Sequence, residues 1–288
     1  MVTAVEVIAT GPLSTVQDLG RPGNAGIGVG VSGAADRGAL RSANRIVGNP
    51  EDAACVEVTL GGFVARASAP LTIAVTGAPC PVTVDGRAAA PHSVVRVPAG
   101  AEFRLGTPDR GLRSYVAVRG GIAVAPVLGS RSTDVLAGLG PEILRPHTVL
   151  PVGPPPEDFP VLDSVPVRPL PTDTVSLRVV PGPRDDWFTT DALETLLGER
   201  YTVTSECDRV GMRLDGPELP RSGVGELPSE GMMPGALQVP PTGTPTLFLA
   251  DHPVTGGYPV IAVVLGSDVD KAAQARPGMR LRFTPSRR

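Results

Sequence analysis

The sequence predicts a mainly β protein with a few short helices, for three reasons. Glycine and proline number 35 and 33 in 288 residues, without a repeat period, which favours many turns. Few stretches carry the apolar spacing of a long helix. Several short stretches alternate apolar and polar residues at the period of a strand with one buried face. The predicted strands are 55–60, 93–97, 114–118, 176–180 and 279–283.

The first predicted helix covers about 36–47. Asp36 is expected as its N-cap and Gly48 as its C-terminal stop, because a carboxylate satisfies the first free N–H groups and glycine adopts the left-handed conformation that ends many helices. Its expected apolar side consists of Leu40, Ala43, Ile46 and Val47.

Two further helices are predicted in the second half of the chain. One lies near 191–197, where Asp191 and Glu194 have the spacing of a capping box. The other follows Ser267 and ends at the Pro277-Gly278 pair.

Two lobes are predicted, separated by a proline-rich stretch. Residues 151–172 are too rich in proline to lie inside a sheet and are expected to be an extended surface connector. The N-terminal lobe then covers 1–160 and the C-terminal lobe 172–288.

A weak similarity between the two halves of the sequence favours this division into two lobes. "VRVPAG" resembles "LQVPPTG", and Tyr115 in "SYVAV" corresponds to Tyr258 in "GYPVIAV", each pair lying about half the chain apart. A duplicated β domain would leave such an offset.

Composition excludes several classes of function. The net charge of −3 gives no general reason to bind nucleic acid or an anionic membrane. Lys271 is the one lysine, and no P-loop pattern is present. The first residues lack a basic region and no apolar run is long enough for a bilayer, so we expect a cytoplasmic protein.

The cysteines and histidines are few. Three widely spaced cysteines without a CxxC pair are expected to be reduced thiols, and no metal site is predicted. His92 and His147 are expected at the surface. His252 lies in "LADHPVTGGYP", where Asp251 ends a strand and a glycine pair could form an anion-binding nest; the alternative is an ordinary hairpin turn.

The strongest candidate for a site is the loop "TVQDLGRPGNAGIGVGVSGAAD", residues 15–36. It has almost nothing apolar to bury, and its glycines do not form a Rossmann fingerprint. Long polar loops in compact domains are commonly functional. We expect Arg21 to present a planar fork to a carboxylate or phosphoryl oxygen, and Asp18 and Ser32 to orient it.

The helix after this loop carries a polar stripe of Arg37, Arg41, Asn44 and Arg45. Such a stripe is usually a solvated face. The alternative is a surface for an acidic substrate or a partner.

Further polar loops are predicted between the strands in the rest of the chain. They carry Arg131 in 118–134, Arg209 in 205–219, and Glu230 and Gln238 in 226–241. This pattern is typical of a β scaffold with a site built from loops at one end. We expect the loops at 17–36 and 251–258 to face one cleft.

The ordered motifs resemble a known family. "TVQDLGRPG", "GVSGAADRGALRSANRIVGN", "VEVTLGG", "LGSRSTD", "DRVGMRL", "GALQVPPTGTP" and "TGGYPVI" are similar to the KipA-type family, also called allophanate hydrolase subunit 2 or biotin-dependent carboxyltransferase-like, which includes the C subunits of bacterial 5-oxoprolinases. The resemblance implies two cyclophilin-like β-barrel lobes. It also implies a KipI-type (allophanate hydrolase subunit 1) partner, and in 5-oxoprolinases a LamB/YcsF-type subunit.

The chemistry implied is ATP-driven opening of 5-oxo-L-proline to L-glutamate, with ATP used by the whole complex. An unstrained lactam is a poor electrophile, and phosphorylating its oxygen supplies a leaving group. Biotin, where relevant, would arrive on another protein. Relatives carry "ADRQTTGGYP" where this chain has His252 and Pro253, which leaves the substrate open because histidine binds anions less firmly than arginine.

Residues and resemblance together define the candidate site. The catalytic candidates are Asp18, Arg21, Asp36 and Asp251. The substrate-binding candidates are Gln17, Ser32, Asn44, Glu57, Arg131, Arg209, Glu230, Gln238, His252, Thr255, Gly256, Gly257 and Tyr258. Which of Asp18, Asp36, Glu57 and Asp251 acts as base stays open.

Three functions are compatible with these observations. The first is a subunit that activates a lactam or amide, with 5-oxoproline preferred. The second is a component that transfers a carboxyl group to a urea-like acceptor. The third is a non-catalytic regulator that binds a KipI-type partner, which the polar character of the 15–36 loop disfavours.

Overall fold

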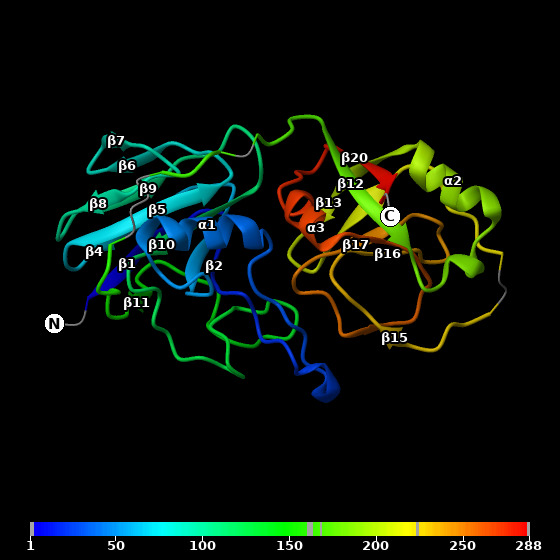
Figure 1. Cartoon of the computed structure of the whole chain (residues 1–288), viewed down its shortest axis with the longest axis horizontal. Helices are drawn as coiled ribbons and strands as arrows, with labels where there is room; N and C mark the ends of the chain where they lie inside the picture. Colours follow the sequence, from blue (N-terminus) through cyan, green and yellow to red (C-terminus); the bar gives the residue numbers. More distant parts are fainter. Residues whose placement is uncertain (1–2, 160–163, 168, 223–224, 287–288) are drawn as a thin grey trace. The chain divides into compact units, whose positions relative to one another are not determined.

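A computed structural model describes residues 3–159, 164–167, 169–222 and 225–286. The chain is mainly β, with 37% of residues in strands and 12% in helices, so the predicted fold class is confirmed. The chain forms two compact units (Figure 1). Unit 1 contains Met1–Arg21, Ser32–Asp134 and Gly138–Leu170, and unit 2 contains Pro22–Val31, Val135–Ala137 and Pro171–Arg288.

Unit 1 contains two antiparallel sheets. The six-stranded sheet has the order β11-β1-β4-β9-β6-β7, and the five-stranded sheet the order β2-β3-β10-β5-β8. The first comprises β1 (Ala4–Thr10), β4 (Phe63–Ala67), β6 (Val82–Val84), β7 (Arg87–Ala89), β9 (Glu102–Leu105) and β11 (Val149–Pro151). The second comprises β2 (Leu13–Gln17), β3 (Cys55–Thr59), β5 (Leu71–Gly77), β8 (Val95–Val97) and β10 (Arg113–Val118).

Both sheets of unit 1 bury one face in a shared core. Valine is its commonest residue, and the core also contains the Phe63 and Phe103 rings, whose centroids are 6.2 Å apart. Valine suits this position because a β-branched side chain packs well on a pleated surface.

Helix α1 (Arg37–Val47) covers the other face of the five-stranded sheet. All six residues of β10 are therefore buried, and Tyr115 and Ala117 pack against Leu40 and Ile46. The expectation that 114–118 has a single buried face is wrong, because the helix shields the second face.

The limits of α1 agree with the sequence prediction. Asp36 accepts a hydrogen bond from the Ala39 N–H at 2.9 Å, and Gly48 ends the helix at φ +72°. Both signals are local, which is why sequence alone located them.

Unit 2 is built around a closed barrel of seven strands in the order β12-β19-β16-β17-β14-β13-β20. Strands β12 and β20 are parallel, and the other neighbours are antiparallel. The barrel comprises β12 (Thr174–Pro181), β13 (Arg200–Cys207), β14 (Gly211–Asp215), β16 (Ala236–Gln238), β17 (Thr246–Phe248), β19 (Val260–Val264) and β20 (Arg280–Pro285). A separate ribbon pairs β15 (Glu230–Gly231) with β18 (Thr255–Gly256).

The other helices of unit 2 differ from prediction at their ends. Helix α2 (Thr190–Gly198) begins after Thr189, so Asp191 lies in its first turn and is not the cap. Helix α3 (Gly266–Ala272) begins after Leu265 and ends five residues before Pro277. The Asp268 side chain is buried and forms a tertiary ion pair with Arg178 and a local one with Lys271, and no side chain caps the start of α3. Two short 3-10 helices, η1 (Ala25–Ile27) and η2 (Asp185–Trp187), complete the elements of the described residues.

The first part of the connector is attached to unit 1 by Arg119. Its guanidinium donates to the carbonyl oxygens of Val47, Pro156 and Asp158 and stacks on the Phe159 ring at 4.3 Å. Residues 160–163 and 168 of the predicted connector lie outside the described residues.

The two tyrosines of the proposed internal similarity differ in their surroundings. Tyr115 is fully buried in β10, whereas Tyr258 is 46% exposed in the loop before β19.

The thiols behave as expected, while one histidine does not. All three cysteines are free, and burial raises the pKa of the Cys55 and Cys80 thiols, which keeps them protonated and unreactive. His147 is exposed, but His92 is buried, so its predicted surface position is wrong. Burial lowers the pKa of His92. No helix among the described residues is both long and apolar enough to cross a bilayer.

Candidate functional site

Asp18 organises the loop that contains Arg131. One carboxylate oxygen accepts hydrogen bonds from the Gly20 N–H at 2.8 Å and from the Ser130 and Ser132 hydroxyls at 2.6 Å each. The other accepts the Arg131 N–H at 2.6 Å. Four donors saturate a buried carboxylate, so Asp18 stabilises the loop rather than presenting a free base.

Arg21 is buried with 1% exposure. Its guanidinium donates to the carbonyl oxygens of Val127 and Ser132 and lies 3.8 Å from the Asp134 carboxylate. This is the arrangement of an arginine that fixes a loop through backbone acceptors. The guanidinium does present the predicted planar set of donors, but the acceptors that these contact belong to this chain.

Gln17 and Ser32 join the same network through Thr133. The Gln17 amide donates to the Thr133 carbonyl oxygen at 2.9 Å, and the Ser32 hydroxyl contacts that oxygen at 3.4 Å. Within the described residues, Gln17 Oε1 and Thr133 Oγ1 are buried without a hydrogen-bond partner. Such atoms commonly hold a buried water or a bound group.

Glu57 forms a second buried network beside the start of α1. It accepts the Tyr115 hydroxyl at 2.7 Å and the Ala35 N–H at 3.0 Å, and lies 3.6 Å from Arg113. The Tyr115 oxygen in turn accepts the Asp36 N–H at 2.7 Å. Burial, with the Glu57 charge nearby, raises the pKa of Tyr115 well above its usual value. The phenol therefore stays protonated and holds the 35–36 backbone.

Asn44 is not part of a solvated stripe. It is buried, and its amide donates to the carbonyl oxygens of Ala53 at 2.7 Å and Glu51 at 3.3 Å. Residues 51–53 fold back over the helix, which a helical wheel cannot show. Arg45 remains exposed and pairs with Glu51.

Arg131 also binds the chain itself. The Nε of its guanidinium donates to the Val124 carbonyl oxygen at 2.8 Å, and its backbone N–H donates to the Asp18 carboxylate. The hydroxyls of Ser130 and Ser132 complete this network. Ser132 belongs to the polar group 131–133 of the sequence, whereas Ser130 was not selected. The two serines that flank Arg131 in the sequence were the signal that could have identified this network.

The central pair of unit 2 is Arg209 with Asp251. Both side chains are completely buried, and the pair is bidentate, with Nε–Oδ2 at 2.8 Å and Nη2–Oδ1 at 2.9 Å. Asp251 also accepts the Val135 N–H at 3.1 Å. A desolvated, bidentate pair with an additional N–H donor fixes its segments in one geometry.

The loop from His252 to Tyr258 is held by its neighbours. His252 Nδ1 lies 2.7 Å from the Pro253 carbonyl oxygen, and since that oxygen only accepts, Nδ1 carries the proton. Gln238 donates to the Tyr258 carbonyl oxygen at 3.0 Å. A Cβ on Gly256 would lie 2.5 Å from Gln238 Nε2, so a side chain there would displace the Gln238 amide that holds the Tyr258 carbonyl oxygen.

Glu230 lies at the base of the same loop. Gly231 and Glu230 pair with Thr255 and Gly256 in the β15–β18 ribbon. Arg184, which sequence reasoning missed, binds the Glu230 carboxylate through Nε at 2.9 and 3.0 Å and through Nη2. This pairing lowers the pKa of Glu230.

The predicted residues therefore differ sharply in accessibility. Thr255, Gly257 and Tyr258 are exposed, whereas the other candidates are buried or half-buried. Gly30, in the part of the 15–36 loop that belongs to unit 2, lies beside His252: a Cβ there would be 3.5 Å from the His252 carbonyl oxygen. The expectation that loops 17–36 and 251–258 face one cleft stays a prediction.

Unit 2 also contains a hollow of about 550 Å³ beside Arg209. Leu136, Cys207, Asp208, Arg213 and Phe248 are among its lining residues. Its volume falls in the range of small-molecule sites, and several of its lining residues belong to the polar loop 205–219 that the sequence analysis selected.

The chain is similar to proteins of known activity. Residues 27–285 match the carboxyltransferase domain, subdomain A and B. The chain is 36% identical over 282 residues to the C subunit of 5-oxoprolinase from Escherichia coli, covering 97% of this chain and 90% of that protein.

Two solved structures share the fold. The crystal structure of TTHA0988 superposes with a TM-score of 0.90 at 35% identity, covering 98% of this chain and 56% of that one. Urea amidolyase of Kluyveromyces lactis superposes with a TM-score of 0.93 at 29% identity, covering 99% of this chain and 19% of that one. The chain thus corresponds to about half of the first protein and a fifth of the second.

Proposed function

Because this chain belongs to the carboxyltransferase-domain family, subdomains A and B, we propose that it is the C-type subunit of a cytoplasmic, ATP-dependent 5-oxoprolinase. The observation that carries the proposal is the 36% identity to the E. coli protein over nearly the full length of both chains. In this assembly the chain acts with a KipI-type subunit and a LamB/YcsF-type subunit, and the three together convert 5-oxo-L-proline to L-glutamate.

The buried arginines do not fit a triphosphate. Arg21 binds backbone carbonyl oxygens, Arg113 faces Glu57, and Arg209 is paired with Asp251. Binding a phosphate chain would require breaking these desolvated contacts, at about 3–5 kcal/mol for a buried pair. We therefore assign ATP to the KipI-type partner.

The contribution of this chain is then to hold and orient the lactam. We assign substrate contact to Thr255, Gly257 and Tyr258, because these are the predicted site residues that are exposed. The Thr255 hydroxyl and the Gly257 N–H can donate to a carboxylate or to the lactam oxygen, whereas Gly256 is paired with Glu230 in the ribbon. The Arg209–Asp251 pair and Gln238 keep that segment in position.

Reconstitution tests this function. The chain alone is expected to be inactive, and ATP-dependent formation of glutamate from 5-oxoproline is expected only when the KipI-type and LamB/YcsF-type subunits are present. Tyr258→Ala should lower kcat/KM without changing Tm, while Met233→Ala, which truncates another exposed side chain, should change neither. Turnover by the isolated chain, or none by the full assembly, would contradict the proposal.

A second candidate function is carboxyl transfer to urea or another amide. The observation that favours it is the superposition on urea amidolyase at a TM-score of 0.93. Biotin would be supplied by a separate carrier protein. Carboxylation of urea by the chain and its partner from a carboxylated biotin carrier, without glutamate formation from 5-oxoproline, would favour this alternative.

A further inference from the structure

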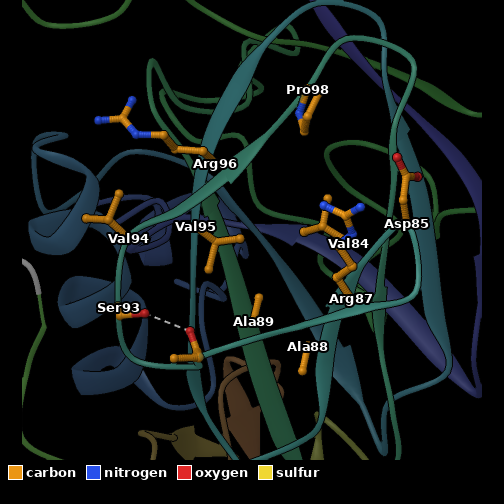
Figure 2. Close-up of a pocket in the computed structure, with 11 residues that line it drawn as sticks. Val84, Asp85, Arg87, Ala88, Ala89, Ser93, Val94, Val95, Arg96 and Pro98 are labelled. Atoms are coloured by element: carbon orange, nitrogen blue, oxygen red, sulfur yellow. Dashed lines mark hydrogen bonds between the residues drawn. The ribbon is translucent and has the colours of Figure 1, made fainter.

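Unit 1 contains a hollow formed by a single stretch of chain. Its volume is about 660 Å³, and all of its lining residues lie between Val84 and Pro98. Figure 2 shows the ribbon of this stretch running round the hollow, from β6 through β7 to β8. The Ser93 hydroxyl donates to the Ala90 carbonyl oxygen at 2.8 Å and joins the two walls at one end.

The walls are the outer strands of two different sheets. β7 is the last strand of the six-stranded sheet and β8 the last of the five-stranded sheet. Residues 87–90 line the hollow consecutively, and so do 93–96. Side chains on one face of a strand would contribute alternate residues, so the hollow meets the edge of β7. On the opposite wall, Ser93 is bridged to Ser164 of the same chain.

The register shows which backbone groups of β7 face outward. Asp85 and Gly86 both have positive φ, +45° and +76°, as in a two-residue type I′ turn, which makes Val84 and Arg87 the hydrogen-bonded pair. Bonded and non-bonded pairs alternate along an antiparallel ladder. Ala88 pairs with Thr83 and is therefore non-bonded, so its N–H and C=O point away from β6.

The side chains that line the hollow are mostly small or apolar, and the charged ones are Asp85, Arg87 and Arg96. Ala88 and Ala90 are exposed and leave the backbone accessible. Asp85 accepts the Glu102 N–H at 2.9 Å. Arg87 is exposed and forms no ion pair with the parts of the chain that the structure describes. Arg96 stacks on Phe159 at 5.6 Å, and Figure 2 shows its guanidinium directed away from the hollow.

We propose that this hollow is a docking site for an extended, acidic segment of another protein chain. The segment adds as a strand to β7, where the Ala88 N–H and C=O pair with its backbone, and one of its carboxylates binds the Arg87 guanidinium. Strand addition explains why the edge carries small residues, and charge complementarity selects an acidic partner over a basic one. The proposal is independent of the proposed 5-oxoprolinase activity.

Fluorescence anisotropy with a labelled peptide tests it. The probe is Thr-Glu-Val-Glu-Val-Thr, compared with the same peptide carrying lysine for glutamate and with a version N-methylated at alternate residues. The acidic probe should bind the full chain at least about tenfold more tightly than either control, as expected for losing one charge-assisted contact or the backbone bonds.

Two variants separate the two contacts. Arg87→Glu should weaken binding about tenfold or more, while Arg110→Glu, a charge reversal at an exposed arginine outside the hollow, should leave it unchanged. Ala88→Pro removes the outward N–H at a position where an edge strand tolerates proline, and should abolish binding with an unchanged circular dichroism spectrum. Equal binding of acidic and basic peptides, competition by free glutarate at the same concentration as the peptide, or binding insensitive to both hollow variants would overturn the proposal.

Discussion

Replacing Arg21 tests whether the loop at 15–36 is held by this side chain. In Arg21→Ala the Ser132 carbonyl oxygen and the Asp134 carboxylate lose a buried cationic partner. Each hydrogen bond to a charged group contributes about 1.5–3 kcal/mol, so the free energy of unfolding of unit 1 should fall by about 2–5 kcal/mol. At about 2–4 °C per kcal/mol for a unit of this size, Tm should fall by about 4–20 °C.

The conservative variant sharpens this test. Arg21→Lys keeps the charge but loses the planar fork, and should recover only part of the stability. Arg110→Ala, at an exposed arginine, should stay within about 0.5 kcal/mol of the parent. Differential scanning calorimetry gives these values, and activity of the reconstituted assembly should fall in parallel with stability. An unchanged Tm in Arg21→Ala, with activity lost, would refute the structural role and assign the guanidinium to a ligand.

Three further predictions follow from the same contacts. Arg209→Leu or Asp251→Leu alone should each cost about 3–5 kcal/mol, and the double variant less than their sum, because each single change leaves a buried charge unpaired. Burial raises the pKa of Asp268, but its hydrogen bonds from Arg178 and Lys271 outweigh this and hold it below the usual 3.8; its stabilisation relative to Asp268→Asn should be complete above that pH and decline as pH falls further. Gly256→Ala should lower activity more than Gly257→Ala, whose new Cβ would meet nothing closer than 3.7 Å.

Each of these has a distinct contradictory result. Additive losses in chemical denaturation would show that the Arg209–Asp251 pair is not coupled. A stability difference between Asp268 and its asparagine variant that does not change between pH 5 and pH 2 would show that the carboxylate is not stabilised as an anion. Equal steady-state kinetics for the two alanine variants would show that the contact at Gly256 does not position the loop.

The elements that were predictable are those whose signals are local. Alternating residues located β3, β8, β10, β12 and β20, and the cap at Asp36 and the stop at Gly48 located α1. Helix α3 was misplaced at both ends, and its start has no side-chain cap that sequence could reveal. Asp268 in its first turn is bound by Arg178, 90 residues away in the chain.

By itself, the sequence determined the mainly β class, the helix at 37–47, and the residue types gathered in the polar loops. The roles of those residues were decided only by tertiary structure. Asp18 meets Ser132 across 114 residues and Arg209 meets Asp251 across 42, so an arginine that could bind a substrate and one that fixes a loop look identical in sequence. The physical reason is that strand and cap preferences depend on neighbours along the chain, whereas the partner of a buried charge depends on which distant segments the fold brings together.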